Sequence, residues 1–197
     1  RIRLLCRDAK GRFDAGFWRR RLEYAWTYRK NVMDPEDLDC CRIVFGEADQ
    51  LPGLTVDRFH DILVTQTMSY GMEQRKSLIF PVLAEVLQAD GQMIRGIYER
   101  NDVALREREG LEQGKGWFAL PGKETPEETC TQIRENGIVY EVDFEHGQKT
   151  GFFLDQKYNR RAVARLARGK RVLDCFTHTG SFALNAALGG AERVTAV

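Results

Sequence analysis

The stretch Val-Leu-Asp-Cys-Phe-Thr-His-Thr-Gly-Ser-Phe at residues 172–182 decides the fold of the C-terminal part of this chain. Residues 171–175 are predicted to form a strand of the buried type, and a polar turn leads from it into a helix predicted over 180–188. A second such strand is predicted at 193–197. Strand, helix and strand in this order form a β-α-β unit, which is the building block of a parallel, doubly wound sheet.

The turn at residues 177–181 lies where an open α/β sheet binds ligands, beyond the carboxyl end of a strand. Asp174 lies near the strand end, Gly180 lets the backbone approach a ligand, and Thr179 or Ser181 is a candidate cap for the helix. Neither G-x-G-x-x-G nor Gly-Lys-Ser/Thr is present, which disfavours a dinucleotide or a nucleoside triphosphate. On this segment alone, a plain strand-to-helix turn and a site for a ligand without phosphates are equally open.

The stretch Gly-Gln-Lys-Thr-Gly-Phe-Phe-Leu-Asp-Gln at residues 147–156 favours the ligand site. Phe152 and Phe153 are adjacent, so one ring can pack inward while the other meets a flat ligand ring. The stretch runs directly into a basic helix predicted over 156–168. The alternative is two core phenylalanines with Asp155 as the helix N-cap, and we expect Asp155 to cap the helix in either case.

Upstream of this stretch, short runs rich in Val, Ile and Thr alternate with turn residues, which predicts strands. The predicted elements are an antiparallel meander at 41–45, 54–58 and 61–68, a helix at 72–87, strands at 96–100 and 117–120, and hairpin strands at 130–133 and 138–144. Asn136-Gly137 in the hairpin is the preferred type I′ turn. We interpret the region before the hairpin as a β-β-α-β-β domain.

The N-terminal part is predicted to be a short strand at 1–8 followed by a helix at 13–31 that begins near Asp14. Trp18 and Trp26 repeat at helical spacing, and we favour core packing for them over base stacking. The opposite helix face carries Arg19, Arg20, Arg29 and Lys30.

The net charge of +1 is uninformative, but the charges are unevenly distributed. Residues 1–33 contain ten Lys/Arg and three Asp/Glu, residues 34–61 contain two and eight, and residues 155–171 contain seven and one. Basic patches near both ends suit a protein that binds a polyanion on selected faces. Ordinary solvated surface charge explains the same pattern equally well.

The overall composition, 43% hydrophobic and 30% charged, is that of an ordinary globular protein and excludes a disordered chain. No apolar run approaches the roughly 20 residues that span a bilayer, and the first residues contain no apolar signal region. The 5 cysteines show no C-x-x-C spacing, which disfavours a zinc site. Their odd number indicates reduced thiols, so we expect a cytoplasmic protein with no membrane association.

Several stretches together make the sequence similar to the large-subunit ribosomal RNA cytosine-C5 methyltransferases that carry an N-terminal PUA domain, a small RNA-binding module. They are Phe-Gly-Glu-Ala-Asp-Gln-Leu-Pro-Gly-Leu-Thr-Val-Asp at 45–57, Tyr-Glu-Arg-Asn-Asp-Val-Ala-Leu-Arg-Glu-Arg-Glu-Gly-Leu at 98–111, and the segments 135–137, 147–160 and 172–182. They follow the family's order, and 147–160 is the most specific. The resemblance implies S-adenosylmethionine (SAM) as cofactor and ribosomal RNA as partner, and it leaves a homodimer open.

The resemblance also implies an α/β and α+β organisation in three parts. Residues 1–32 would be the end of the PUA domain and a linker helix, 33–125 the central β-β-α-β-β domain, and 126–197 the N-terminal part of a truncated Rossmann-like methyltransferase domain. The implied SAM contacts are Gln148, Thr150, Phe152, Asp155, Gln156, Arg160, Asp174, Phe176, Thr179, Gly180 and Ser181.

The family's chemistry requires a thiolate that attacks C6 of cytosine and activates C5. The resemblance places that cysteine beyond Val197, so we assign no catalytic residue in this chain and expect Cys175 to be a core residue. The acidic residue expected after the second strand of the catalytic sheet is likewise absent. Two alternatives stay open: a related enzyme that methylates another base or a protein, and a non-catalytic RNA-binding or assembly module.

Overall fold

The computed structural model describes residues 2–8 and 10–197, and its contacts divide the chain into two compact units. Unit 1 comprises Arg1–Ile133 and Glu141–Phe152, and unit 2 comprises Arg134–Tyr140 and Phe153–Val197. The hairpin strands β6 (Cys130–Glu135) and β7 (Ile138–Asp143) contribute residues to both units. Asn136 and Gly137 join them with φ angles of 52° and 82°, which confirms the predicted type I′ turn.

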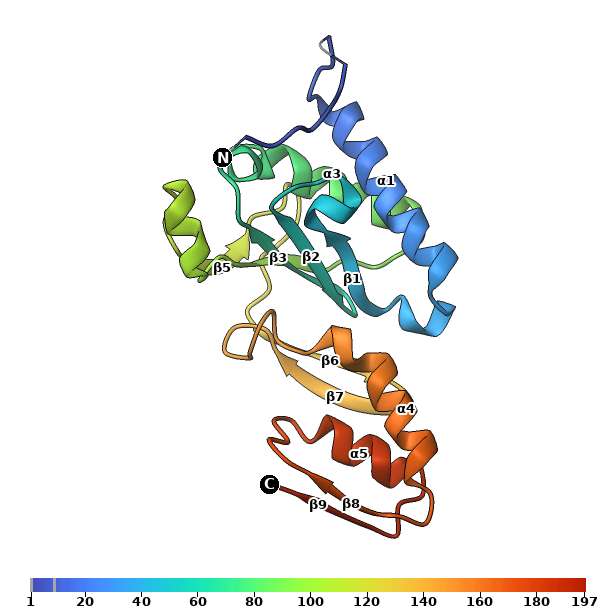
Figure 1. The fold of residues 1–197 in the computed structure, drawn as a ribbon. Coiled ribbons are helices and arrows are strands. Elements are labelled where there is room, and N and C mark those ends of the chain that lie inside the picture. The colour runs from blue at the N-terminus through green and yellow to red at the C-terminus, as the bar shows by residue number, and fades with distance from the viewer. Residues whose placement is uncertain (1, 9) are drawn as a thin grey trace. The chain divides into compact units, whose positions relative to one another are not determined.

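Unit 1 contains a five-stranded sheet in the order β1-β2-β3-β4-β5 (Figure 1). The strands are β1 (Cys40–Phe45), β2 (Leu54–Phe59), β3 (Ile62–Thr67), β4 (Gly96–Arg100) and β5 (Lys115–Phe118). The first three form the predicted antiparallel meander, β4 joins β3 in parallel, and β5 is antiparallel to β4. The predicted β-β-α-β-β pattern was one strand short, because β1 pairs with β2 as a full member of the sheet.

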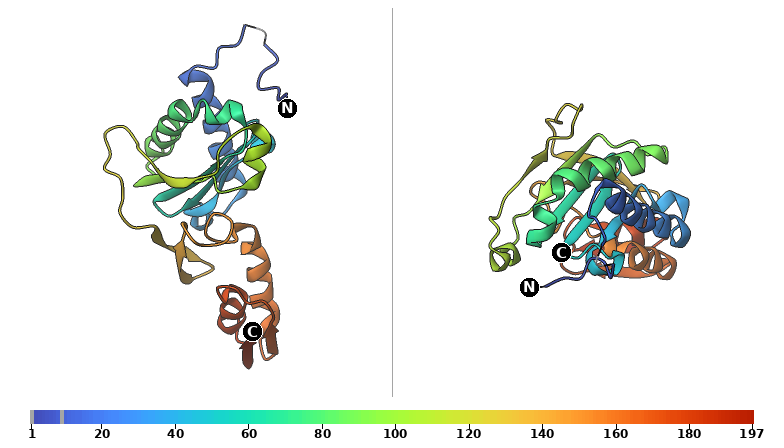
Figure 2. Two further views of the ribbon diagram at one scale, coloured as in Figure 1. Left: turned by 90° about the vertical axis from the view of Figure 1, so that its left-hand side faces the viewer. Right: turned by 90° about the horizontal axis from the view of Figure 1, so that it is seen from above.

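Two helices, α1 (Ala15–Val32) and α3 (Lys76–Ala89), pack against each other and cover the same face of this sheet (Figures 1 and 2). Asp14 caps α1 by accepting a hydrogen bond from the Phe17 backbone N–H at 3.0 Å, as its position predicted. Trp18 and Trp26 are both buried in the hydrophobic core, which confirms their core assignment. The shorter helical elements of unit 1 are α2 (Tyr70–Glu73) and the 3₁₀ turns Pro35–Asp37, Gly46–Asp49 and Ala104–Glu109.

The strand predicted at 1–8 is absent from the described residues 2–8. A strand needs a neighbour for its backbone groups, and this segment meets side chains instead. The Leu5 carbonyl accepts a hydrogen bond from Arg21 at 3.1 Å, and Arg3 forms an ion pair with Glu109 at 3.0 Å.

Unit 2 contains the predicted β-α-β unit: β8 (Arg171–Asp174), α5 (Ser181–Leu188) and β9 (Arg193–Ala196), with β8 and β9 parallel. Helix α4 (Lys157–Ala167), which follows the 3₁₀ turn Leu154–Gln156, packs against α5. The strands are not buried as predicted, since Leu173 is 63% exposed. A parallel strand is buried only when both of its faces are covered. Within residues 2–8 and 10–197, no helix is long and apolar enough to cross a membrane.

Candidate functional site

One row of side chains crosses the sheet of unit 1 from edge to edge. Register pairs Arg42 with Asp57, Asp57 with Val64, Val64 with Tyr98, and Tyr98 with Trp117. Residues opposite one another on paired strands point to the same face of a sheet. The row therefore presents an ion pair at one end and two aromatic rings at the other.

The loop after β7, residues 144–152, packs on this row. Phe144 is fully buried, with its ring centroid 5.1 Å from that of Tyr98 and 5.5 Å from that of Trp117. Arg100 donates hydrogen bonds to the carbonyl oxygens of Phe144 at 2.8 Å and Gly147 at 3.0 Å. Burial and the nearby Glu145 raise the pKa of Tyr98 to about 12. The backbone of the loop is thus held by side chains from β4.

Thr150 connects the same loop to β2. Its hydroxyl donates a 2.6 Å hydrogen bond to Asp57, and both side chains are buried. Arg42 donates two further hydrogen bonds to the Asp57 carboxylate, at 2.7 and 2.9 Å. A buried carboxylate with three charge-assisted or hydroxyl donors is a rigid attachment point. The Thr150 hydroxyl, predicted as a cofactor contact, is therefore engaged within the protein.

The loop also depends on a glycine at 147. A Cβ at Gly147 would lie 2.3 Å from the carbonyl oxygen of Asp143, a backbone atom that cannot move aside cheaply. Within the loop, Gln148 is exposed, whereas Phe152 at its end is buried. Phe153 is partly exposed and stands edge-on to His178 at 5.2 Å, which confirms that the two adjacent rings face different environments.

In unit 2, Asp174 organises the turn between β8 and α5. Its Oδ2 accepts hydrogen bonds from the Thr177 hydroxyl at 2.7 Å and the Ala183 backbone N–H at 3.1 Å. Asp174 therefore caps α5, and the predicted capping by Thr179 or Ser181 is wrong: the N-cap position is Gly180, which has no side chain to offer. A carboxylate suits this place because the helix N-terminus carries a partial positive charge.

The rest of this turn is open. Phe176 is 97% exposed and has a φ of 60°, and Gly180 has a φ of 72° with no atom within 4 Å of an added Cβ. The Oδ1 atom of Asp174 accepts no hydrogen bond from the described residues. An exposed ring, an open glycine and an available carboxylate oxygen fit a ligand with a flat ring and hydroxyl or ammonium donors, as SAM has.

Two further predicted contacts flank the start of α4. Asp155 lies in the 3₁₀ turn before the helix, and the N-cap residue is Gln156, which makes no side-chain capping bond. The prediction that Asp155 caps α4 was therefore wrong, because the chain enters this helix through a tighter turn that uses backbone bonds. Asp155 is exposed and Gln156 is partly exposed.

Arg160, also predicted as a cofactor contact, is buried within unit 2. It forms a bidentate ion pair with Glu135 at 2.6 and 2.8 Å and donates to the Phe153 carbonyl at 2.9 Å. Both charged side chains are at most 1% exposed. Burial and the Glu135 carboxylate raise the pKa of Tyr140 to about 12. The guanidinium thus links α4 to the hairpin.

The sequence alone indicated no role for Glu135, Asp57 or Arg100, although all three lie in the stretches that carry the resemblance. Cys175 is exposed, so its expected core position is wrong. No group of three or more His, Cys, Asp or Glu side chains that could hold a metal ion occurs in the part of the chain that the structure describes.

Comparisons with known proteins point to one family. Residues 99–197 match the family described as S-adenosylmethionine-dependent methyltransferase. Proteins named "Ribosomal RNA large subunit methyltransferase I" are 38% identical in Escherichia coli O127:H6 and 39% identical in Klebsiella pneumoniae strain 342, each over the whole of this chain and 48% or 47% of the relative. The chain thus spans about half the length of these curated relatives.

Solved structures agree with the family. A protein from Streptococcus mutans described as a SAM-dependent methyltransferase is 26% identical with a TM-score of 0.74, covering 95% of this chain and 46% of its own. A methyltransferase complexed with SAH is 26% identical with a TM-score of 0.75, covering 95% and 45%. With half of its length matched by the family model, the chain belongs to the S-adenosylmethionine-dependent methyltransferases.

Proposed function

We propose that the protein methylates large-subunit ribosomal RNA with SAM as the methyl donor, and that its acceptor is C5 of cytosine. The observation that supports this most is the 38% identity, along the whole chain, to relatives named for large-subunit ribosomal RNA methylation. The cytosine-C5 acceptor rests on the resemblance alone. Ribosomal RNA is the proposed partner, and size-exclusion chromatography with light scattering would show whether a homodimer forms.

The proposed SAM contacts divide by exposure. Gln148 in unit 1 is open to solvent, as are Asp155, Phe176 and Thr179 in unit 2. We assign direct contact to these residues, to Gln156, to the free oxygen of Asp174 and to the turn at Gly180. We assign a positioning role to Thr150, Phe152, Arg160 and Ser181, because their side chains are buried within the protein.

When bound, SAM supplies an electrophilic methyl group. This chain's own residues would bind and orient it: the Phe176 ring against a flat surface of the ligand, and Asp174 as an acceptor for hydroxyl or ammonium donors. The thiolate that C5 methylation requires is not assigned to any cysteine of this chain. The three-part division at 1–32, 33–125 and 126–197 stays a proposal, including the PUA end.

The test is methylation of ribosomal RNA isolated from a strain in which the gene is deleted, using full-length protein and isotopically labelled SAM. Mass spectrometry of the nucleosides should show label in 5-methylcytidine. Label in another nucleoside would support the alternative acceptor. Absence of label with all substrates, together with no SAM binding by isothermal titration at about millimolar cofactor, would contradict the proposal and favour a non-catalytic module.

A further inference from the structure

Three exposed aromatic rings line one hollow on unit 1. Tyr24 and Tyr28 on α1 are 67% and 57% exposed, and Phe45 at the end of β1 is 57% exposed. All three line a hollow of about 410 Å³. Exposed aromatic rings that gather in one place mark a binding surface, since scattered single rings are the ordinary case.

Two of these rings are held in position by arginines. The Arg29 guanidinium lies 5.3 Å from the Tyr28 ring centroid, and that of Arg42 lies 5.2 Å from the centroid of Phe45. Arg29 is itself fixed by Asp49 at 2.6 Å. Rings that are already oriented lose little freedom when a partner stacks on them, which favours binding.

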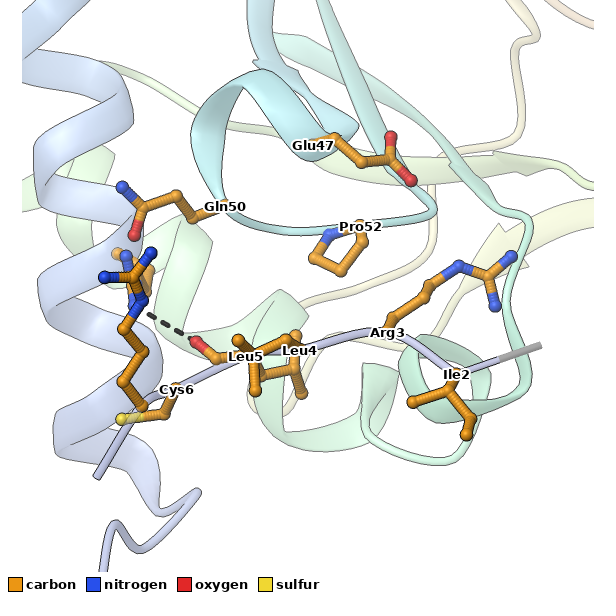
Figure 3. Close-up of a pocket in the computed structure, with 10 residues that line it drawn as sticks. Ile2, Arg3, Leu4, Leu5, Cys6, Glu47, Gln50 and Pro52 are labelled. Carbon is orange, nitrogen blue, oxygen red and sulfur yellow. Dashed lines mark hydrogen bonds between the residues drawn. The ribbon is translucent and has the colours of Figure 1, made fainter. Parts of the chain in front are cut away.

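A second hollow of about 780 Å³ adjoins the first, because Arg21 and Gln50 line both. The segment Ile2–Arg7 forms one wall, and Glu47, Gln50 and Pro52 face it (Figure 3). The Leu5 carbonyl, which accepts the hydrogen bond from Arg21, turns towards α1 in this view. The two hollows together form one surface, the aromatic–arginine surface.

The residues that line the two hollows include four arginines against the two carboxylates of Glu47 and Asp49, which leaves a positive charge. Arg3 pairs with Glu109, and Arg29 with Asp49. Arg7 and Arg21 line the larger hollow and form no ion pair with any carboxylate among residues 2–8 and 10–197. Guanidinium groups that have no carboxylate partner and lie beside exposed rings complement a ligand that offers both phosphates and flat bases.

We propose that the aromatic–arginine surface binds a single-stranded segment of RNA, with bases stacked on Tyr24, Tyr28 and Phe45 and phosphates near Arg7 and Arg21. The proposal rests on the proposed function only in taking RNA as the substrate class. A protein partner or a second copy of this chain would use the apolar area of the rings but would have no need of two arginines without ion pairs beside them.

The test uses full-length protein and a fluorescently labelled single-stranded RNA of about 12 nucleotides, a length typical of such sites. Y24A/Y28A should raise the Kd at least about tenfold, because each stacked base contributes on that scale. Y24F/Y28F keeps both rings and should bind within about twofold of the wild type. R7A/R21A should weaken binding and flatten its salt dependence, since fewer counterions are released.

The variant Y24L/Y28L distinguishes RNA from a protein partner, because Leu keeps an apolar side chain but removes the aromatic ring. These residues are exposed on a helix, and Leu and Ala are both good helix formers, so the fold is expected to persist. If bases stack on the rings, the Leu variant should lose RNA affinity as the Ala variant does. Wild-type RNA affinity in the Ala or Leu variants would overturn the proposal, and a change of oligomeric state in them would assign the surface to protein docking.

SAM affinity, measured on the same variants by titration, checks that they are folded. It should be unchanged. It also separates two failures: a wild-type protein that binds no SAM contradicts the proposed function, whereas variants that keep both SAM and RNA affinity contradict only the proposed surface.

Discussion

The two segments most strongly predicted to meet the cofactor are built in opposite ways. The loop at 147–152 is tied to the sheet of unit 1 by the buried Thr150–Asp57 bond and by Arg100. The turn between β8 and α5 is held mainly by Asp174, and Phe176 within it is 97% exposed. Both segments are predicted to contact the ligand, but they differ in structure. The loop is rigid and faces inward, whereas the turn is open and faces outward.

This difference separates two ways in which a residue can serve a binding site. A buried hydrogen-bonded side chain fixes the backbone near a ligand and is costly to remove. An exposed side chain contributes little to the stability of the fold and remains available to contact the ligand. Changes in the loop should thus lower stability and binding together, whereas replacing an exposed side chain of the turn should lower binding alone.

The largest expected effect is that of Gly147→Ala. The new Cβ would lie 2.3 Å from the Asp143 carbonyl oxygen, so the loop must shift, at a cost of about 3 kcal/mol. Gly180→Ala is the matched control, because its Cβ meets open space and only the φ of 72° is strained, which costs about 1–2 kcal/mol. Urea unfolding would measure both, and equal losses would remove the contrast between the segments.

Thr150→Val should come next. It keeps the shape of the side chain but removes the 2.6 Å donor to the buried Asp57, lowering the free energy of unfolding by about 1–3 kcal/mol. SAM affinity should fall in parallel, while Thr150→Ser restores the hydroxyl and should recover much of both. If Thr150→Val keeps the wild-type free energy of unfolding but loses SAM binding, Thr150 contacts SAM directly instead.

A smaller effect should appear at alkaline pH. Burial and Glu145 raise the pKa of Tyr98, which packs beneath the loop, from 10.0 to about 12. Folding therefore favours the neutral phenol, and this stabilisation is complete below pH 10.0 and is lost as the pH rises towards 12. The urea midpoint should fall over this range, and it should fall less in Tyr98→Phe. Identical pH profiles for the two proteins would exclude Tyr98 as the cause.

Phe176→Ala should have the smallest effect on stability, within about 0.5 kcal/mol, because the ring has almost no contacts to lose. Its SAM affinity should nonetheless fall about tenfold or more. Calorimetric titration beside thermal unfolding measures both quantities. A large loss of stability would show that the ring is packed in the full-length protein.

Local patterns predicted most of the elements. Helical spacing located α1 and α4, Asn136-Gly137 located the hairpin, and alternation of strand and helix located β8, α5 and β9. The errors came from contacts between residues that are far apart in the sequence. The strand predicted at 1–8 depended on a neighbour that local sequence could not supply.

Contacts between distant residues explain what was missed at the candidate site. Thr150 and Asp57 are 93 positions apart, and Arg160 and Glu135 are 25 apart. The resemblance rests in part on the stretches at 45–57, 98–111 and 135–137. Only the fold shows that side chains in these stretches hold the loop after β7 and helix α4 in place. The sequence therefore located the elements that carry the candidate residues, but it did not show which of these side chains bond to one another inside the protein.

The most direct test of the account is hydrogen–deuterium exchange of the full-length protein with and without SAM. We predict slower exchange on SAM addition at residues 176–183, whose open turn gains a ligand. Protection at 147–152 should be present already without SAM, because Arg100 and Asp57 hold that loop, and should change less. Exchange that SAM leaves unaltered at 176–183, or that is equally fast in both segments without it, would contradict the account.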